Sequence, residues 1–218
     1  MTKPKNSFRF YFILALFFST LIFASGLSIG LLVDSFKENF LMSGINDLKA
    51  SIQNTEIEML LMDYLEKNMT CSYLNYKSFN LMRQANDLGS QVNDYEKANS
   101  QRTTDYVALK TDYMGLLVKN WIVLEKIKRE CNSNYSIILY FYKTKDECLD
   151  CSNQGIILTH LKDKYDKDLM IFAIDSSLNA GFISLIEQSF NVTKYPSITI
   201  DNELMPGFRT MEEIEALI

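Results

Sequence analysis

A long apolar run opens the hydrophobic pattern of this chain, because no charged side chain occurs in residues 10–33. As a helix rising about 1.5 Å per residue, this run reaches about 36 Å, enough to cross a hydrocarbon core of about 30 Å. Basic side chains precede it in residues 1–9, and this positive excess predicts a cytoplasmic N-terminal tail. The pattern therefore predicts a single-pass cell-membrane protein, with a transmembrane helix in contact with lipid and the remainder extracytoplasmic.

Two other interpretations of this run stay open. Ala24-Ser25-Gly26 fits the small-residue cleavage site of a secretory signal peptide, although the apolar run is longer than a usual signal core and continues past that site. The run is also compatible with a buried helix of a soluble protein, where this length without a charge is unusual. The anchor and the signal peptide both place the rest of the chain on the oxidising side of a membrane.

Residues 34–132 carry apolar side chains at steps of three, four and seven, which are typical of packed α-helices. They predict two or three helices in a hairpin or a small coiled-coil-like bundle, with a break near residues 68–72 and a turn around residues 97–103. The Tyr and Leu positions are interpreted as packing core, and no cofactor is expected. The apolar positions include Phe36, Phe40, Leu41, Ile45, Leu48, Ile52, Leu74, Leu81, Leu88, Val92, Tyr106, Leu109, Tyr113, Leu116 and Leu124.

In residues 134–218 the pattern changes to short apolar runs that alternate with helical periods. The predicted order is βαβαββα, which indicates an α/β domain whose sheet is covered on its faces. Thr210 and Glu213 have the spacing of a capping box at the start of the last helix. The expected elements are strands at 136–142, 169–174, 197–201 and 204–208, and helices at 149–165, 178–190 and 210–218, with the hairpin turn at Asn202-Glu203.

Composition narrows the possible partners. The chain has a net charge of −5 and four cysteines in 218 residues. No basic run occurs, so nucleic acid is not expected as a partner. An even cysteine count suits an oxidising compartment. Three N-glycosylation acceptor patterns, at Asn68, Asn134 and Asn191, are compatible with an extracytoplasmic location.

Cys71 and Cys131 lie 60 residues apart, each within a helical pattern. If the chain turns near residues 97–103, both lie near one end of the hairpin, and a structural disulfide between them is favoured in an oxidising compartment. Two independent buried thiols are the alternative. A redox pair that relays electrons to other cysteines is a third interpretation, which nothing in the spacing supports.

Cys148-Leu149-Asp150-Cys151 follows an apolar strand and begins a helical segment, and Tyr195-Pro196 directly precedes another strand. This ordered set is typical of thiol–disulfide exchange. Zinc binding is the chemical alternative, with His160 as a third ligand, but the domain has no fourth Cys or His and no metal site is expected.

On these residues, with the hairpin and Gly207, residues 134–218 resemble the thioredoxin-like superfamily in a compact form without the extra leading strand and helix. With the anchor, the chain resembles a membrane-tethered extracytoplasmic thiol–disulfide oxidoreductase with a mixed sheet. The resemblance implies that Cys148 is an exposed nucleophile at a helix N-terminus and that Cys151 resolves the mixed disulfide. It also implies that Tyr195 lends its backbone to a bound peptide before a cis Pro196. Protein thiols or disulfides would be the substrates, together with a redox partner.

The chain departs from that family at the cysteines. Glu147 replaces the aromatic residue that commonly precedes the first cysteine, and Asp146 and Asp150 add negative charge, which disfavours a thiolate. We therefore expect Cys148 to be less acidic than in strong oxidants, with reductant or isomerase character. The alternative function is a non-catalytic binding or scaffolding module in which the C-x-x-C forms a structural disulfide.

Overall fold

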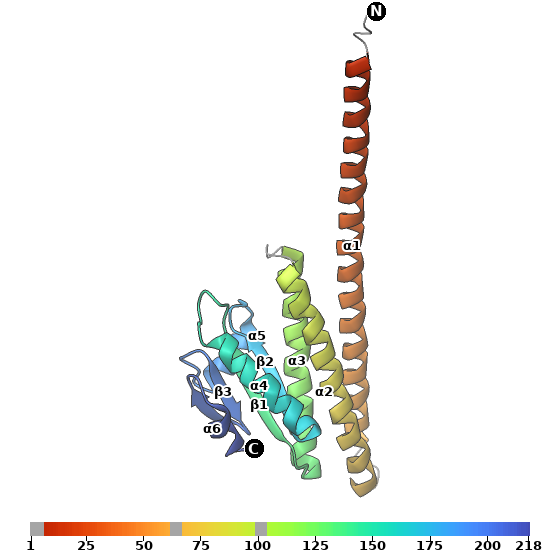
Figure 1. Ribbon diagram of the computed structural model, residues 1–218. Helices are drawn as coiled ribbons and strands as arrows, with labels where there is room; N and C mark the ends of the chain where they lie inside the picture. Colours follow the sequence, from red (N-terminus) through yellow and green to blue (C-terminus); the bar gives the residue numbers. More distant parts are fainter. Residues whose placement is uncertain (1–6, 62–66, 99–103) are drawn as a thin grey trace, which may run out of the picture. The chain divides into compact units, whose positions relative to one another are not determined.

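A computed structural model describes residues 7–61, 67–98 and 104–218 of the chain (Figure 1). It divides into two compact units, Met1–Ser43 and Gly44–Ile218, and each is described by itself. The boundaries expected from the sequence, at residues 9, 33 and 132, stay predictions.

The described part of the first unit belongs to α1, a helix that spans Ser7–Leu60. Its segment Phe10–Gly30 is long and apolar enough to cross a membrane, and its side chains are exposed. A signal sequence near the N-terminus has the same length and composition. This segment is therefore compatible both with a membrane span and with a signal sequence.

The helical part of the second unit consists of the last turns of α1, α2 (Lys67–Ala98) and α3 (Thr104–Cys131). Side chains from all three helices are buried, including Ile52, Leu81 and Leu124. The predicted break near residues 68–72 is wrong, because these residues lie inside α2, which begins at Lys67. Their polar side chains suit the first turns of a helix as well as a loop. The turn expected at residues 97–103 lies mostly outside the described residues.

The sheet has four strands in the order β2-β1-β3-β4. β1 pairs with β2 in parallel and with β3 in antiparallel orientation, and β3 pairs with β4 in antiparallel orientation. β1 has the predicted bounds, whereas the second helix of this region begins three residues later than predicted because a turn holds Asp175–Ala180. The elements are β1 (Ser136–Tyr142), α4 (Cys151–Tyr165), a 3₁₀ turn (Asp166–Asp168), β2 (Leu169–Asp175), α5 (Gly181–Ser189), β3 (Ser197–Ile200), β4 (Glu203–Pro206) and α6 (Met211–Glu215).

The two faces of this sheet are covered by different parts of the chain. Tyr140 faces a core formed with α4 and α6, where Leu161 and Ile214 are fully buried. On the other face, Phe190 at the end of α5 contacts both Phe141 of β1 and Trp121 of α3, with ring centroids 6.3 and 6.1 Å apart. Helix α3 thus covers part of the sheet, so residues 134–218 do not bury both sheet faces by themselves.

Local sequence signals explain the β3–β4 turn and the start of α6. The β3–β4 turn is formed by Asp201 and Asn202, whose φ angles are 46° and 75°, one residue earlier than predicted. Asp and Asn tolerate this left-handed conformation better than Glu203 does. The predicted capping box of α6 is confirmed, since Thr210 and Glu213 each accept a hydrogen bond from the other's backbone.

Candidate functional site

The sulfur atoms of Cys148 and Cys151 form a disulfide, with their Cα atoms 5.5 Å apart. Cys148 belongs to the loop after β1, where its backbone N–H donates to the Thr144 carbonyl over 2.9 Å. Cys151 is the first residue of α4. The disulfide therefore connects the loop that leaves the central strand to the start of the following helix.

Two expectations about Cys148 are wrong. Its exposed fraction is 5%, and that of Cys151 is 4%, so the first cysteine is not an exposed nucleophile in this oxidised state. The helix begins at Cys151 after the N-cap Asp150, so Cys151 holds the helix N-terminus and Cys148 precedes it. The Leu149 side chain between the two buried cysteines is 81% exposed.

The Tyr195–Pro196 peptide bond is cis, as expected. Since β1 and β3 are antiparallel and Phe141 pairs with Ser197, the start of β3 lies beside the end of β1. The loop that carries Cys148 and the Tyr195–Pro196 peptide therefore meet at one edge of the sheet. A direct contact supports this placement, because the Lys143 ammonium lies 5.1 Å from the centre of the Tyr195 ring.

Two polar groups of this segment, the Tyr195 hydroxyl and the Pro196 carbonyl, have partners within the fold. The Tyr195 hydroxyl donates to the Glu187 carboxylate over 2.7 Å, and the Pro196 carbonyl accepts from the Gly207 N–H over 2.9 Å. Burial of the ring and then the hydrogen bond to Glu187 raise the pKa of Tyr195 to about 12. The Tyr195 side chain therefore stays a neutral donor at physiological pH.

The carboxylate of Glu147, next to Cys148, is held by three side chains. Lys143 donates to it over 3.2 Å, and the hydroxyls of Thr144 and Ser177 donate over 3.2 and 3.1 Å. These hydrogen bonds, above all the one from Lys143, lower the pKa of Glu147. Glu147 is therefore ionised near neutral pH, and the Lys143 ammonium partly balances its effect on Cys148.

Two buried polar residues behind the disulfide were missed by the sequence reasoning. The Tyr140 hydroxyl donates to the Cys151 carbonyl, and the fully buried Gln154 accepts from the Arg209 N–H over 2.8 Å. These bonds fix the first turn of α4 to β1 and to the segment after β4. The sequence signal for Gln154 was its place on the buried face of α4, with Cys151, Leu158 and Leu161 at helical spacing. Ile156, which the sequence pattern had included among the apolar positions of this helix, is 68% exposed.

Cys71 and Cys131 are also joined by a disulfide, which connects the start of α2 to the end of α3. Cys131 precedes β1 and Cys148 follows it, so the seven-residue strand separates the two pairs by about 20 Å. Direct exchange between the pairs does not occur over such a distance. The electron relay between them therefore receives no support.

His160 lies exposed on α4, nine residues past Cys151. Within residues 7–61, 67–98 and 104–218, no group of three or more His, Cys, Asp or Glu side chains is arranged to hold a metal ion.

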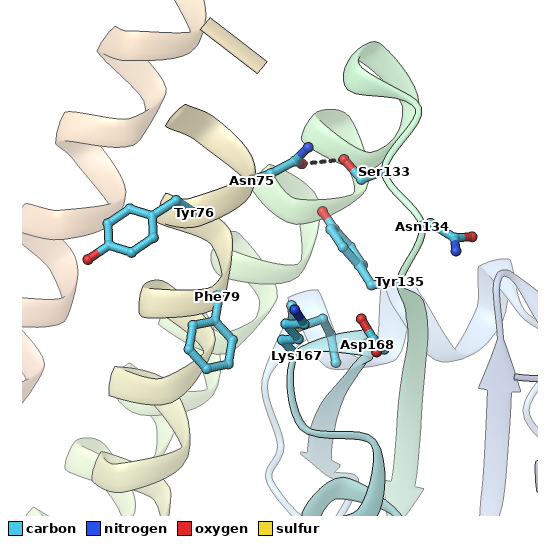
Figure 2. A pocket seen from close by; sticks show the side chains of 9 residues that line it. Asn75, Tyr76, Phe79, Ser133, Asn134, Tyr135, Lys167 and Asp168 are labelled. Atoms are coloured by element: carbon cyan, nitrogen blue, oxygen red, sulfur yellow. Dashed lines mark hydrogen bonds between the residues drawn. The ribbon is translucent and has the colours of Figure 1, made fainter. Parts of the chain in front are cut away.

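An open pocket of about 400 Å³ lies at the other end of the sheet, where β1 and β2 begin (Figure 2). Tyr76 and Phe79 of α2 line one side, and the Ser133 hydroxyl donates to Asn75 at its rim. Lys167 and Asp168 complete the opposite side. None of the cysteines lines this pocket, so it does not belong to the candidate redox site.

Comparisons with known proteins give partial likenesses. No family model matches the chain, and no curated protein sequence matches it. Among solved structures, the chain is similar to a malarial protein (22% identity, 38% of this chain, 93% of that chain, TM-score 0.34). It is also similar to thioredoxin-2, described as a component of the malaria parasite protein secretion machinery (23% identity, 39% of this chain, 82% of that chain, TM-score 0.34). A third is the germline-specific thioredoxin Deadhead from Drosophila melanogaster (19% identity, 44% of this chain, 87% of that chain, TM-score 0.31).

Proposed function

We propose that this chain is a membrane-anchored extracytoplasmic protein that exchanges disulfides with other proteins through Cys148 and Cys151. The observation that carries the proposal is the Cys148–Cys151 disulfide at the sheet edge where the cis Tyr195–Pro196 peptide leads into β3. The substrates are protein thiols or disulfides, and a second redox protein restores the pair. No cofactor or metal is part of the proposal.

In the oxidative direction, a substrate thiolate attacks Sγ of Cys148, the Cys148–Cys151 bond breaks, and Cys151 leaves as a thiolate. A second substrate thiolate then attacks the mixed disulfide, forms the substrate disulfide and releases Cys148. Two electrons pass from the substrate to the pair, and the reverse sequence reduces a substrate disulfide. The helix N-terminus favours the Cys151 thiolate, because the first amides of α4 face it with the positive end of the helix dipole.

Burial of Cys148 adds a requirement to this mechanism. An attacking sulfur must reach Cys148 along the axis of the disulfide, and only 5% of this residue is exposed. Part of what holds the loop between Lys143 and Asp150 is the set of exposed hydrogen bonds from Lys143 and Thr144 to Glu147, which open at low cost. A substrate therefore gains access when this loop moves outward with Leu149.

Insulin reduction by dithiothreitol tests the proposal. The wild-type chain should accelerate the reduction, and Cys148→Ala should abolish the acceleration, because no Cys148 thiolate is then present to attack an insulin disulfide and form the mixed disulfide. Cys151→Ala should accumulate covalent complexes with client proteins, since Cys148 cannot be released by its partner cysteine. The Cys71→Ala/Cys131→Ala variant is the matched control, and it should keep the activity.

The second candidate is a non-catalytic binding or scaffolding module with a structural Cys148–Cys151 disulfide. The burial of both cysteines favours it specifically. In that case the wild-type chain would not accelerate insulin reduction, and its Cys148–Cys151 bond would resist dithiothreitol until the chain unfolds.

The location has its own test. The exposed apolar segment Phe10–Gly30 supports an anchor, because a contiguous apolar surface of this kind is not tolerated in water. A reporter fused after Ile218 should be active only outside the cytoplasm, and the mature protein should keep residues 10–33. Cytoplasmic activity would contradict the orientation, and loss of the segment would show a cleaved signal peptide.

A further inference from the structure

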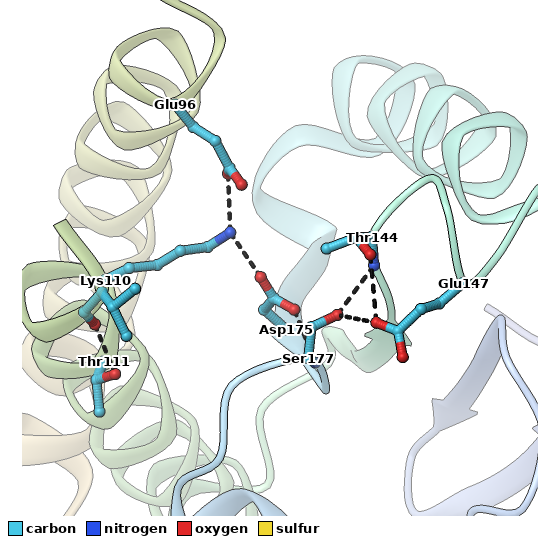
Figure 3. A network of polar contacts seen from close by, with 8 residues as sticks. Glu96, Lys110, Thr111, Thr144, Glu147, Asp175 and Ser177 are labelled. Carbon is cyan, nitrogen blue, oxygen red and sulfur yellow. Dashed lines mark hydrogen bonds and ion pairs between the residues drawn. The ribbon is translucent and has the colours of Figure 1, made fainter. Parts of the chain in front are cut away.

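A buried lysine lies between the helical hairpin and the sheet. Lys110 of α3 is 2% exposed, and its ammonium lies 2.6 Å from the carboxylate of Asp175 and 2.8 Å from that of Glu96 (Figure 3). The rings of Tyr106 and Tyr142 lie 5.9 and 6.0 Å from the same ammonium. Groups from α2, α3, β1 and β2 thus surround this one charge.

Asp175 connects this cluster to the loop that carries Cys148. It ends β2, is fully buried, and accepts the Ser177 N–H over 2.9 Å. The Ser177 hydroxyl accepts the Thr144 N–H over 3.0 Å and donates to Glu147 over 3.1 Å. The Thr144 carbonyl in turn accepts the N–H groups of Glu147 and Cys148, each over 2.9 Å.

A continuous series of hydrogen bonds and ion pairs therefore leads from α3 to the backbone of Cys148, and Figure 3 shows it from Glu96 to Glu147. Stability alone does not account for the buried charge pair, because well-packed apolar residues of the same size are often as stabilising. A buried ion pair does impose one geometry on the elements it joins, since each charged group left without its partner is disfavoured.

We infer that Lys110 is a positioning residue for the Cys148–Cys151 pair: through Asp175 and Ser177, helix α3 fixes the Thr144–Cys148 loop and so sets the reactivity of the pair. This inference rests on the proposed function and names what regulates that site. A rearrangement of the hairpin, for example when a partner binds it, then alters the redox equilibrium of the Cys148–Cys151 pair, which lies after the end of β1.

The test uses the full-length chain in detergent micelles, with Cys71→Ala/Cys131→Ala as background so that one pair titrates. Lys110→Met removes the ammonium and keeps a flexible side chain of similar length. Two properties of the pair are measured: its equilibrium with glutathione, and the pH dependence of Cys148 alkylation in the reduced protein. If Lys110 had only a structural role, Lys110→Met would lower the folded fraction. It would not shift the pH dependence of Cys148 alkylation in the molecules that remain folded.

The matched control is Lys128→Met. Lys128 also lies on α3 and forms a 2.6 Å ion pair with the sheet region, but its partner Asp201 is in the β3–β4 turn, away from Cys148. We expect Lys110→Met to change the glutathione equilibrium constant by about threefold or more, which for this two-electron couple is a shift of about 14 mV. Lys128→Met should leave both readouts unchanged.

Ser177→Ala keeps the proposal testable if Lys110→Met does not fold. It cuts the same series of contacts at a half-buried hydroxyl, and it should shift both readouts in the same direction as Lys110→Met. Equal readouts for Lys110→Met and Lys128→Met, or unchanged readouts in Ser177→Ala, would overturn the inference. Failure of the proposed function is a different result, because the wild-type chain would then not accelerate insulin reduction and its Cys148–Cys151 bond would resist reductant until the chain unfolds.

Discussion

Loss of the Cys71–Cys131 disulfide should destabilise the helical hairpin strongly. The bond joins the first turns of α2 to the last residue of α3, and its cysteines are 60 residues apart. Replacement of both cysteines by alanine removes this constraint from the unfolded chain. The native helices keep their packing, since residues such as Leu81 and Leu124 remain buried between them.

The expected magnitude follows from loop entropy. Closing a loop of about 60 residues removes unfolded-state entropy worth about 4 kcal/mol at 25 °C, an upper figure. The same relation gives about 2 kcal/mol for the short Cys148–Cys151 loop. Since domains of this kind unfold with about 5–15 kcal/mol, the longer loop contributes a large share.

Urea unfolding of the oxidised full-length chain, followed by fluorescence of its single tryptophan, measures the effect. Trp121 of α3 contacts Phe190, so its emission reports separation of α3 from the sheet region. The Cys71→Ala/Cys131→Ala variant should unfold at a midpoint lower by about 2 M urea, given typical slopes of about 1–3 kcal/mol per molar. Reductant should lower the wild-type midpoint more than that of the variant. Equal midpoints without reductant would refute the reasoning.

Three further substitutions test single contacts. Gly89→Ala should destabilise by about 1–3 kcal/mol in urea unfolding, because its Cβ would lie 2.4 Å from the Tyr113 hydroxyl oxygen, and Tyr113→Phe in the same chain should recover part of the loss. Thr210→Ala removes the cap of α6 and should cost about 1 kcal/mol in the same assay, with no change in insulin reduction. Glu147→Gln should lower the pKa of Cys148, read from the pH dependence of alkylation, because a neighbouring negative charge disappears. The Glu147 contacts stabilise the fold above its ordinary pKa of 4.5 and are lost as the pH falls through its lowered folded pKa, so wild type and Glu147→Gln should converge in stability in acid.

Sequence patterns predicted the structure correctly where it depends on residues that are neighbours along the chain. The apolar run 136–142 is β1 with those bounds, and the spacing of Thr210 and Glu213 predicted the capping box. Both depend on residues within one element, so the period of the side chains and the local donors carry the information.

These patterns could not predict contacts between residues that are far apart along the chain. Lys110 has the sequence character of an exposed helical lysine, and its partner Asp175 lies 65 positions further along the chain. The burial of Cys148 depends on how the loop after β1 folds inward, which no period in the sequence encodes. The cover of α3 over the sheet likewise required the tertiary arrangement, because its apolar stripe fits a helical bundle equally well.

The observed burial supports the expectation that Cys148 is less acidic than in strong oxidants, and it argues against an exposed Cys148 at the helix N-terminus. Burial disfavours a charged Cys148 thiolate, and so does the ionised Glu147 beside it, although Lys143 offsets part of that charge. The helix N-terminus favours a thiolate at Cys151 instead. A strong oxidant needs a stabilised thiolate in its reduced form, and the surroundings of Cys148 do not supply that stabilisation. The glutathione equilibrium should therefore give a potential closer to about −270 mV than to about −120 mV, and a value near the latter would contradict the assignment of the charges around Cys148.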